Sequence, residues 1–351
     1  MRRFGKISIA TAAAASLLVL AACGSDSDTT AGSDTTESTA TSDIKVGLAY
    51  DVGGRGDQSF NDAAAAGLDK AKGEFGVEAT ESEATEGEAE SAREDRLIQM
   101  ADAGYNPVIA VGFAYAEAVG KVAPQYPDIN FGLIDSTDAT GDNIANLTFT
   151  EEQGSFLVGA AAALKSKTGT IGFVGGVNVP LIVKFQAGYA AGAQAVNPQI
   201  KIKSTYLSQP PDYGGFGDPA KGKTAAEGMY DAGADVVYHA AGGSGLGVFQ
   251  AAKAADKWAI GVDSDQYLTA ADDLKPHILT SMLKKVDVAV YEYIKSFVDG
   301  SPMTGPTVFD LKASGVDYST SGGFVDDIKD KLDDYKQQII DGTITVPTEV
   351  K

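Results

Sequence analysis

The 351-residue sequence predicts an α/β protein made of two doubly wound parallel-sheet lobes with a ligand cleft between them. Short apolar runs typical of strands alternate with longer amphipathic stretches typical of helices, and parallel sheets with helices on both faces produce this alternation. The strand candidates are apolar at nearly every position, as expected when both faces of a sheet are covered. The length is more than one hydrophobic core usually supports, which favours two lobes.

Taken in chain order, the elements alternate along most of the sequence. The strand candidates are 44–50, 107–111, 130–134, 170–174, 235–239, 259–262 and 277–283. The helical patterns cover 61–74, 88–103, 117–123, 151–165, 182–196, 220–232, 246–255, 286–298 and 325–340.

The residues that follow the strand candidates suggest a polar cleft. Asp51, Asp135 and Asp263 each come directly after a strand, and glycine pairs follow two other strands. Aspartate and glycine are common in turns, so each position alone is a weak signal. In sheets of this kind, however, ligands bind beyond the carboxyl ends of the strands. The repetition therefore predicts that these side chains gather at one binding site.

Composition excludes several classes of function. The net charge is −20, whereas a nucleic-acid binder needs a basic face to displace counterions. The two histidines, His239 and His277, and the single cysteine, Cys23, provide almost no material for zinc sites or Cys/His catalysis. We therefore expect no metal, no other cofactor and no internal disulfide.

The N-terminus has the pattern of a lipoprotein signal. Three cations fall within the first six residues, an apolar stretch covers 7–20, and Leu-Ala-Ala-Cys ends at Cys23. This ending resembles the bacterial lipobox, in which the cysteine is acylated; the alternative is an ordinary signal peptide. We expect 1–22 to be removed and Cys23 to carry lipid. Residues 24–43 are rich in Ser, Thr and Asp and predict a disordered tether that holds the lobes outside the cell membrane.

The stretch GDPAKGKT at 217–224 has the spacing of a phosphate-binding P-loop. A P-loop requires a buried strand directly before its first glycine, but a polar run with two prolines precedes Gly217. The simpler interpretation is a helix start with Asp218 as its N-cap and Pro219 at its first position.

Several longer motifs resemble the basic membrane protein family, the lipid-anchored substrate-binding proteins of ABC transporters typified by purine nucleoside receptors. They include DVGGRGDQSFND (51–62), FGLIDS (131–136), EEQGSFLVGAAAAL (151–164), GDPAKGKTAAEGMYDAGADVVYHAAGGSGLGVF (217–249) and GVDSDQ (261–266). The resemblance runs through most of residues 44–350.

This resemblance implies a periplasmic-binding-protein-like type I fold, in which the chain crosses three times between two lobes. The lobe boundaries that we predict place 44–149 and about 265–301 in the first lobe, and 150–264 and about 302–351 in the second.

The resemblance also implies how a purine base would be held. Phe60 would stack on the ring, because a flat aromatic side chain offers contact area at low entropic cost. Asn61 carries both a donor and an acceptor for a base edge. Asp51 and Asp135 would accept hydrogen bonds from ring or exocyclic N–H groups. His239 would cover the second base face, although a core histidine is an equally good interpretation.

The sugar would be held by a second group of residues. Asp263 would accept from the ribose hydroxyls and Lys284 would donate to them, with Lys285 as the alternative lysine. Gly242 and Gly243 would let backbone N–H groups approach the ligand closely.

The expected function is capture of a purine nucleoside, such as inosine, guanosine or adenosine, and delivery to an ABC permease without any catalysis. Two alternatives remain open. One is a binding protein of the same fold for a sugar or another small polar solute. The other is a secreted nucleoside hydrolase that uses the aspartates as acid and base.

Overall fold

A computed structural model describes residues 43–85 and 87–350. The predicted signal peptide, Cys23 and nearly all of the predicted tether lie outside these residues. Within them, no helix combines the length and the apolar character needed to cross a membrane. The described residues belong to one compact unit.

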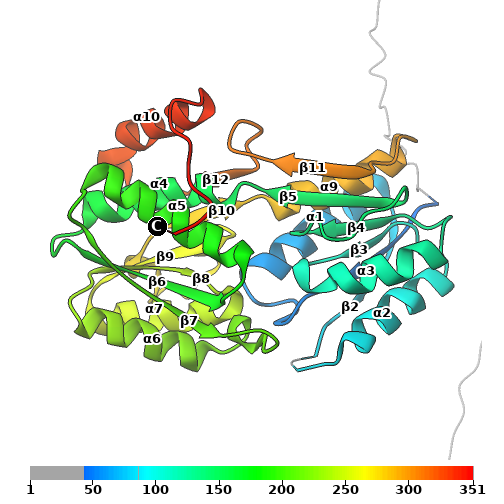
Figure 1. Ribbon diagram of the computed structural model, residues 1–351, viewed down its shortest axis with the longest axis horizontal. Helices are drawn as coiled ribbons and strands as arrows, with labels where there is room; N and C mark the ends of the chain where they lie inside the picture. The colour runs from blue at the N-terminus through cyan, green and yellow to red at the C-terminus, as the bar shows by residue number, and fades with distance from the viewer. Residues whose placement is uncertain (1–42, 86, 351) are drawn as a thin grey trace, which may run out of the picture. The chain divides into compact units, whose positions relative to one another are not determined.

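The first of two β-sheets has six parallel strands in the order β11-β5-β4-β3-β1-β2 (Figure 1). Its strands are β1 (Lys45–Ala49), β2 (Glu78–Ser82), β3 (Val108–Ala110), β4 (Phe131–Ile134), β5 (Ile144–Phe149) and β11 (Gly305–Phe309). On one face α1 (Phe60–Phe75) packs against α9 (Val286–Val298), and on the other α2 (Glu90–Asp102) packs against α3 (Ala116–Val122). This sheet and its helices form the first lobe.

The second sheet has six strands in the order β12-β10-β9-β8-β6-β7, of which β12 alone runs antiparallel to its neighbour. They are β6 (Thr170–Val177), β7 (Lys201–Ser208), β8 (Val236–Ala240), β9 (Trp258–Asp263), β10 (Ile278–Lys284) and β12 (Val316–Tyr318). The helices α4 (Glu151–Lys165) and α5 (Pro180–Val196) cover one face, and α6 (Pro219–Asp231) and α7 (Gly245–Ala255) cover the other. With α8 (Gln266–Thr269) and α10 (Lys329–Ile340), they form the second lobe.

Single turns of 3-10 helix connect several of these elements. They are η1 (Phe113–Tyr115), η2 (Ala123–Gln125), η3 (Gly214–Phe216), η4 (Gly242–Ser244), η5 (Lys275–His277) and η6 (Asp326–Ile328).

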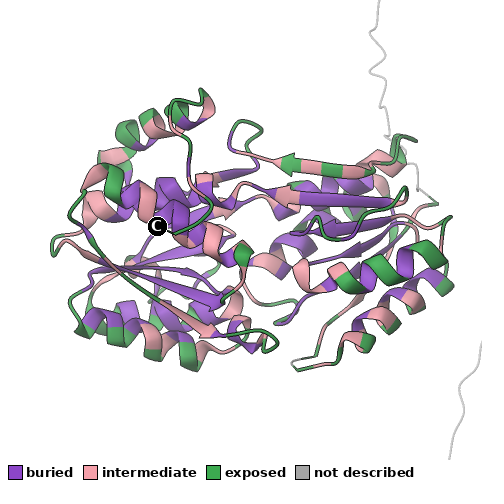
Figure 2. Ribbon diagram, in the orientation of Figure 1, coloured by how far each residue is buried: buried purple, intermediate pink, exposed green. Residues whose placement is uncertain are grey.

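The predicted fold class is confirmed: both sheets are largely parallel and carry helices on both faces. Figure 2 shows why most of the central strands were recognisable, since they are buried along nearly their whole length. Every predicted strand and helix is present. Five strands were not predicted: β5, which is largely buried inside the first sheet, and the four edge strands β2, β7, β11 and β12. The sequences of β2 and β7, EATES and KIKSTYLS, are polar or mixed. An edge strand faces solvent on one side and does not need an apolar sequence.

The chain passes between the lobes three times, from β5 to α4, from β10 to α9 and from β11 to β12. The strands at these crossings lie at one side of each sheet, and β2 and β7 lie at the opposite edges.

The observed boundaries differ from the predicted ones near two of these crossings. Residues 265–301 were expected in the first lobe, but β10 pairs with β9 and therefore belongs to the second. Residues from 302 onward were expected in the second lobe, but β11 pairs with β5 in the first. A buried strand such as β10 has the same apolar pattern in either sheet, and β11 is a partly exposed edge strand without a clear strand pattern, so the sequence pattern alone could not assign either one.

Candidate functional site

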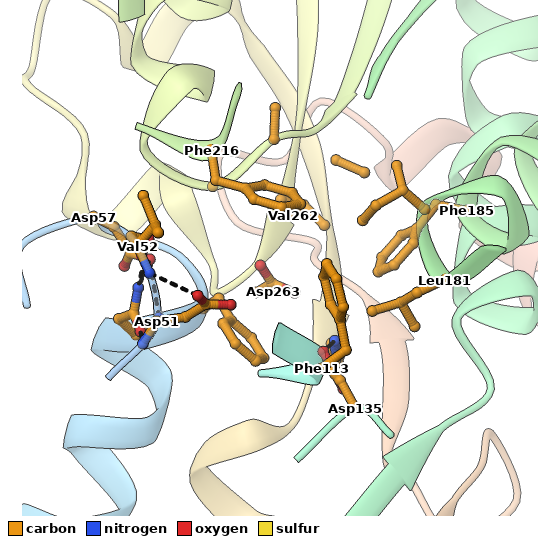
Figure 3. Close-up of a pocket in the computed structure, with 17 residues that line it drawn as sticks. Asp51, Val52, Asp57, Phe113, Asp135, Leu181, Phe185, Phe216, Val262 and Asp263 are labelled. Carbon is orange, nitrogen blue, oxygen red and sulfur yellow. Dashed lines mark hydrogen bonds and ion pairs between the residues drawn. The ribbon is translucent and has the colours of Figure 1, made fainter. Parts of the chain in front are cut away.

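A cavity with an empty volume of about 510 Å³ lies between the carboxyl ends of the two sheets. Figure 3 shows side chains from both lobes pointing into it. Seven predicted site residues line the cavity: Asp51, Phe60, Asn61, Asp135, Gly242, Asp263 and Lys284.

Three aspartates enter the cavity because each lies where a buried strand ends. Asp51 follows β1, Asp135 follows β4 and Asp263 is the last residue of β9. Asp135 and Asp263 have φ angles of 68° and 63°, in the left-handed region. Aspartate tolerates this conformation better than most residues do. Non-glycine residues in this conformation often occur at functional sites, where the surrounding structure supports the strain.

Each of these carboxylates uses one oxygen within the protein. Asp51 Oδ1 accepts from the Val52 backbone N–H at 2.8 Å, and Asp263 Oδ2 accepts from Ser59 Oγ at 2.7 Å. Asp135 Oδ2 accepts from Lys284 Nζ at 2.5 Å, and its Oδ1 is buried without a hydrogen-bond partner in the described part of the chain. The site can therefore accept hydrogen bonds from several donors on a ligand.

Lys284 is the lysine that faces the cavity, and Lys285 is not among the lining residues. The Lys284 side chain is 2% exposed and lies between carboxylates, with Nζ 3.9 Å from Glu151 Oε1 in addition to its Asp135 partner. Its ammonium group also lies over three rings, 4.7 Å from the centroid of Phe60, 5.2 Å from Phe149 and 5.5 Å from Phe185. These contacts fix the position of the cation at the inner end of the site.

Burial and nearby charges shift the pKa values of the ionisable groups in the site. Burial raises the pKa of Asp51 and the pKa of Asp263 to about 6 each. At Asp263 the positive charge of Lys284 opposes this shift. Burial also raises the pKa of Glu151 to about 8. Burial lowers the pKa of Lys284, but the nearby carboxylates outweigh this effect and raise it overall. Lys284 is therefore a cation at neutral pH.

Asn61 is hydrogen-bonded within the protein. Its Oδ1 accepts from the Asp51 backbone N–H at 3.0 Å, and its Nδ2 donates to Asp57 Oδ2 at 3.1 Å. The amide thus helps to hold the loop before α1. Asp57 also accepts from the backbone N–H groups of Ser59 and Asp62, so it stabilises the same loop.

The aromatic wall of the cavity includes Phe60, as predicted, and three rings that the sequence analysis missed. Phe113 follows β3, Phe185 lies on α5 and Phe216 ends the loop after β7. The Phe113 and Phe216 rings meet at 6.4 Å between centroids and 69° between planes. In Figure 3, Phe216 lies across the cavity from Asp51 and Asp135. Of these three, only Phe113 lies shortly after the end of a strand, a position that could have been recognised in the sequence.

His239 does not line the cavity, so its expected place on a base face is not supported. Its side chain is fully buried against the first part of α7, where its ring packs edge-on against Phe249 at 5.2 Å. A Cβ at Gly245 would lie 2.0 Å from this ring, which shows how tightly the helix start covers it. Burial lowers the pKa of His239 to about 3, so the imidazole is neutral. The core interpretation of this residue fits the structure.

The two expected glycines differ in their position. Gly242 lines the cavity and has a φ of 52°, a conformation that glycine adopts without strain. Gly243 follows it in η4 but is not among the lining residues.

Comparison with known proteins identifies the family. Residues 44–349 match the family model described as "Bmp: ABC transporter substrate-binding protein PnrA-like". The chain belongs to this Bmp family. It is 35% identical to the "ABC transporter nucleoside-binding protein BmpA" of Lactococcus lactis subsp. cremoris, a match that covers 98% of this chain and 99% of the relative. It is also 35% identical to an uncharacterized lipoprotein of Pyrococcus abyssi, over 82% of this chain and 72% of the relative.

A solved structure supports the same assignment. The crystal structure of "ABC transporter system solute-binding proteins" from Aeropyrum pernix K1 superposes with a TM-score of 0.76 at 31% identity. The superposition covers 88% of this chain and 94% of the other. This Bmp family member is therefore an ABC transporter substrate-binding protein. Its GDPAKGKT segment begins α6, where the Asp218 side chain accepts from the Lys221 backbone N–H at 2.9 Å, as the N-cap interpretation predicted.

Proposed function

We propose that this protein captures purine nucleosides between its lobes and delivers them to the permease of an ABC importer. The observation that carries the proposal is a single cavity that combines aromatic rings with acceptors and a cation. Phe60, Phe113 and Phe216 offer flat apolar surface for a base, and Asp135, Asp263 and Lys284 offer partners for hydroxyl groups. The name of the Lactococcus relative, which includes nucleoside binding, supports the same ligand class.

Capture requires no chemical step. A ligand that contacts side chains of both lobes favours the closed arrangement by its higher affinity for that state. Asp51 and Asp135 come from the first lobe, while Asp263 and Lys284 come from the second. A nucleoside that pairs with both groups would hold the lobes together until the closed protein meets the permease.

Isothermal titration would test the ligand class. Residues 24–351 contain both lobes entirely and would be denatured and refolded to remove any bound ligand. They would then be titrated with adenosine, guanosine, inosine, uridine and ribose. We expect one-to-one binding of purine nucleosides. Binding of ribose without any nucleoside would favour the sugar alternative, and release of free base from inosine would favour the hydrolase.

A matched pair of phenylalanines on α1 would test the stacking role. Phe60 begins the helix and lines the cavity, whereas Phe75 ends it and stacks on Tyr291 at 5.4 Å. Loss of an aromatic stacking partner costs about 1–3 kcal/mol per base, so Phe60→Ala should weaken nucleoside binding roughly 5- to 150-fold. Phe75→Ala should leave the affinity unchanged. Equal effects of the two substitutions would argue against base stacking on Phe60.

We also propose that Cys23 is acylated and anchors the protein to the outer face of the cell membrane. The lipobox-like sequence before Cys23 and the lipoprotein name of the Pyrococcus relative support this. Labelled palmitate should be incorporated into the full chain expressed in bacteria and not into Cys23→Ser. Equal labelling of both would contradict the anchor site.

A further inference from the structure

Arg93 and Tyr213 make a contact between the lobes outside the cavity. Arg93 lies on α2 of the first lobe, and Tyr213 lies in the loop between β7 and α6 of the second. The guanidinium carbon is 5.7 Å from the centroid of the tyrosine ring, within the range of a cation–π interaction. Neither residue is among those that line the cavity.

This contact lies on the side of the molecule away from the crossings. Helix α2 follows the edge strand β2, and the Tyr213 loop follows the edge strand β7. The three crossings leave from strands at the other side of each sheet. Opening of the lobes about the crossings separates the far edges most, because displacement grows with distance from the axis. The Arg93–Tyr213 contact is therefore among the first to break when the cleft opens.

Ring contacts connect Tyr213 to the aromatic side chains that line the cavity. Tyr213 meets Phe113 edge-on, with 5.7 Å between centroids and 81° between planes. Phe113 in turn meets Phe216, and both of these rings line the cavity. Tyr213 thus supports Phe113 directly, and Phe216 through Phe113, and both of these rings face the ligand cavity.

Arg93 is held in place by its own lobe before it meets Tyr213. The residue is 4% exposed, and its guanidinium lies 3.2 Å from Glu90 Oε2 and 3.8 Å from Glu88 Oε1. It also lies over the Tyr115 ring at 5.9 Å. A cation fixed in this way loses little further freedom when a ring docks on it, so the contact favours closure at low entropic cost.

We propose that Arg93 and Tyr213 are positioning residues that latch the mouth of the cleft in the closed state. The latch holds Phe113 and Phe216 against the ligand and slows ligand release, while neither latch residue touches the ligand. The inference rests on solute capture by the family and uses the proposed nucleoside only as a probe.

The first experiment measures closure without ligand, so it does not depend on the proposed nucleoside. Spin labels would be placed at Asp95→Cys on α2 and Glu227→Cys on α6, two exposed positions in different lobes, in the full chain with Cys23→Ser. Pulsed electron paramagnetic resonance would give the distance distribution between them. We expect Arg93→Met and Tyr213→Leu to shift the distribution toward longer distances.

Arg96 provides a matched control on the same helix. It pairs with Glu88 at 2.7 Å, and like Arg93 it lies 5.9 Å from the Tyr115 ring. Both of these partners belong to the first lobe. Arg96→Met should leave the distance distribution unchanged if the latch depends on the contact with Tyr213. Equal shifts for Arg93→Met and Arg96→Met, or no shift for Tyr213→Leu, would overturn the proposal.

The second experiment separates release from capture by stopped-flow kinetics with a purine nucleoside. Tyr213→Leu should raise the dissociation rate constant roughly 3- to 30-fold, with the association rate constant changed less than about twofold. Tyr213→Phe keeps the ring face and should resemble the parent.

A double-mutant cycle tests whether the two residues act together. Combining Arg93→Met with Tyr213→Leu should raise the dissociation rate no further than the larger single effect. The latch would be contradicted if the fold-increase in the dissociation rate constant of the double variant equalled the product of the two single fold-increases. It would also be contradicted if the substitutions slowed association and left dissociation unchanged. Complete absence of nucleoside binding by the parent would instead refute the proposed function, and the distance measurement would still decide the latch.

Discussion

Lys284 and Asp135 form an ion pair between the lobes, with 2.5 Å between Nζ and Oδ2, although one ends β10 and the other follows β4. Their side chains are 2% and 4% exposed, so water screens this pair little. Glu151 Oε1 lies 3.9 Å from the same ammonium group. The cation therefore compensates the buried Asp135 carboxylate at the point where the chain passes between the lobes.

Lys284→Met should destabilise the ligand-free protein by about 3–5 kcal/mol, because it leaves the buried Asp135 carboxylate without its cation. The measurement is urea unfolding at neutral pH. Lys285→Met is the control, because the Lys285 side chain follows Lys284 but does not line the cavity. This substitution should change the free energy of unfolding by less than about 0.5 kcal/mol. Adding Asp135→Asn to Lys284→Met should restore part of the loss. Similar stability of the two lysine variants would contradict the role of the pair.

Asp51→Asn should change the pH dependence of stability. Burial raises the pKa of Asp51 from 3.8 to about 6, so between these values the folded protein binds more protons than the unfolded chain. The Asp51 contribution to stability therefore falls as pH rises through this window. Asparagine does not titrate, so the stability of the variant relative to the parent should increase from pH 4 to pH 7. The increase should be on the order of 1.4 kcal/mol for each pKa unit, and a constant difference across this range would contradict it.

His239→Phe should change the pH dependence of stability in the opposite direction. Burial lowers the pKa of His239 from 6.5 to about 3, so between these values the unfolded chain binds the proton and the folded protein does not. The parent therefore loses stability as pH falls from about 6.5 toward 3, and the variant should lose less over the same range. Unfolding by denaturant at several pH values measures this difference. Nucleoside affinity should stay the same at pH 7, because the ring lies outside the cavity; a large loss of affinity would place His239 in the site after all.

Two glycines of α6 should respond in opposite directions to alanine. A Cβ at Gly222 would lie 2.2 Å from the Ser244 carbonyl oxygen, so Gly222→Ala should destabilise the protein by about 1–3 kcal/mol through overpacking. A Cβ at Gly228 meets nothing within 4 Å, so Gly228→Ala should stabilise it by about 0.5–1 kcal/mol. Thermal unfolding followed by circular dichroism distinguishes the two. Equal effects would show that Gly222 is not needed for the close approach of α6 to η4.

The strand-end rule explains which site residues the sequence could reveal. Asp51, Asp135 and Asp263 directly follow or end buried parallel strands, and the carboxyl ends of such strands converge on one place. Phe185 and Phe216 come from a helix and a loop, and their approach to the cavity depends on how those segments pack. The hydrogen bonds of Asn61 likewise depend on the conformation of a loop that has no periodic pattern. Sequence reasoning could name Asn61 as a polar residue near the ligand but could not show that its amide is already engaged.

The sequence by itself determined the α/β class, most of the central strands, most helices and the family resemblance, because apolar periodicity and motif spacing are properties of neighbouring residues. Tertiary structure alone decided that β10 belongs to the second sheet and β11 to the first. It also decided that Lys284 rather than Lys285 enters the cavity and that His239 lies in the core. These outcomes depend on contacts between segments far apart in the chain. A buried strand, a lysine at a strand end and a histidine before a glycine turn each have the same local sequence signal in more than one three-dimensional setting.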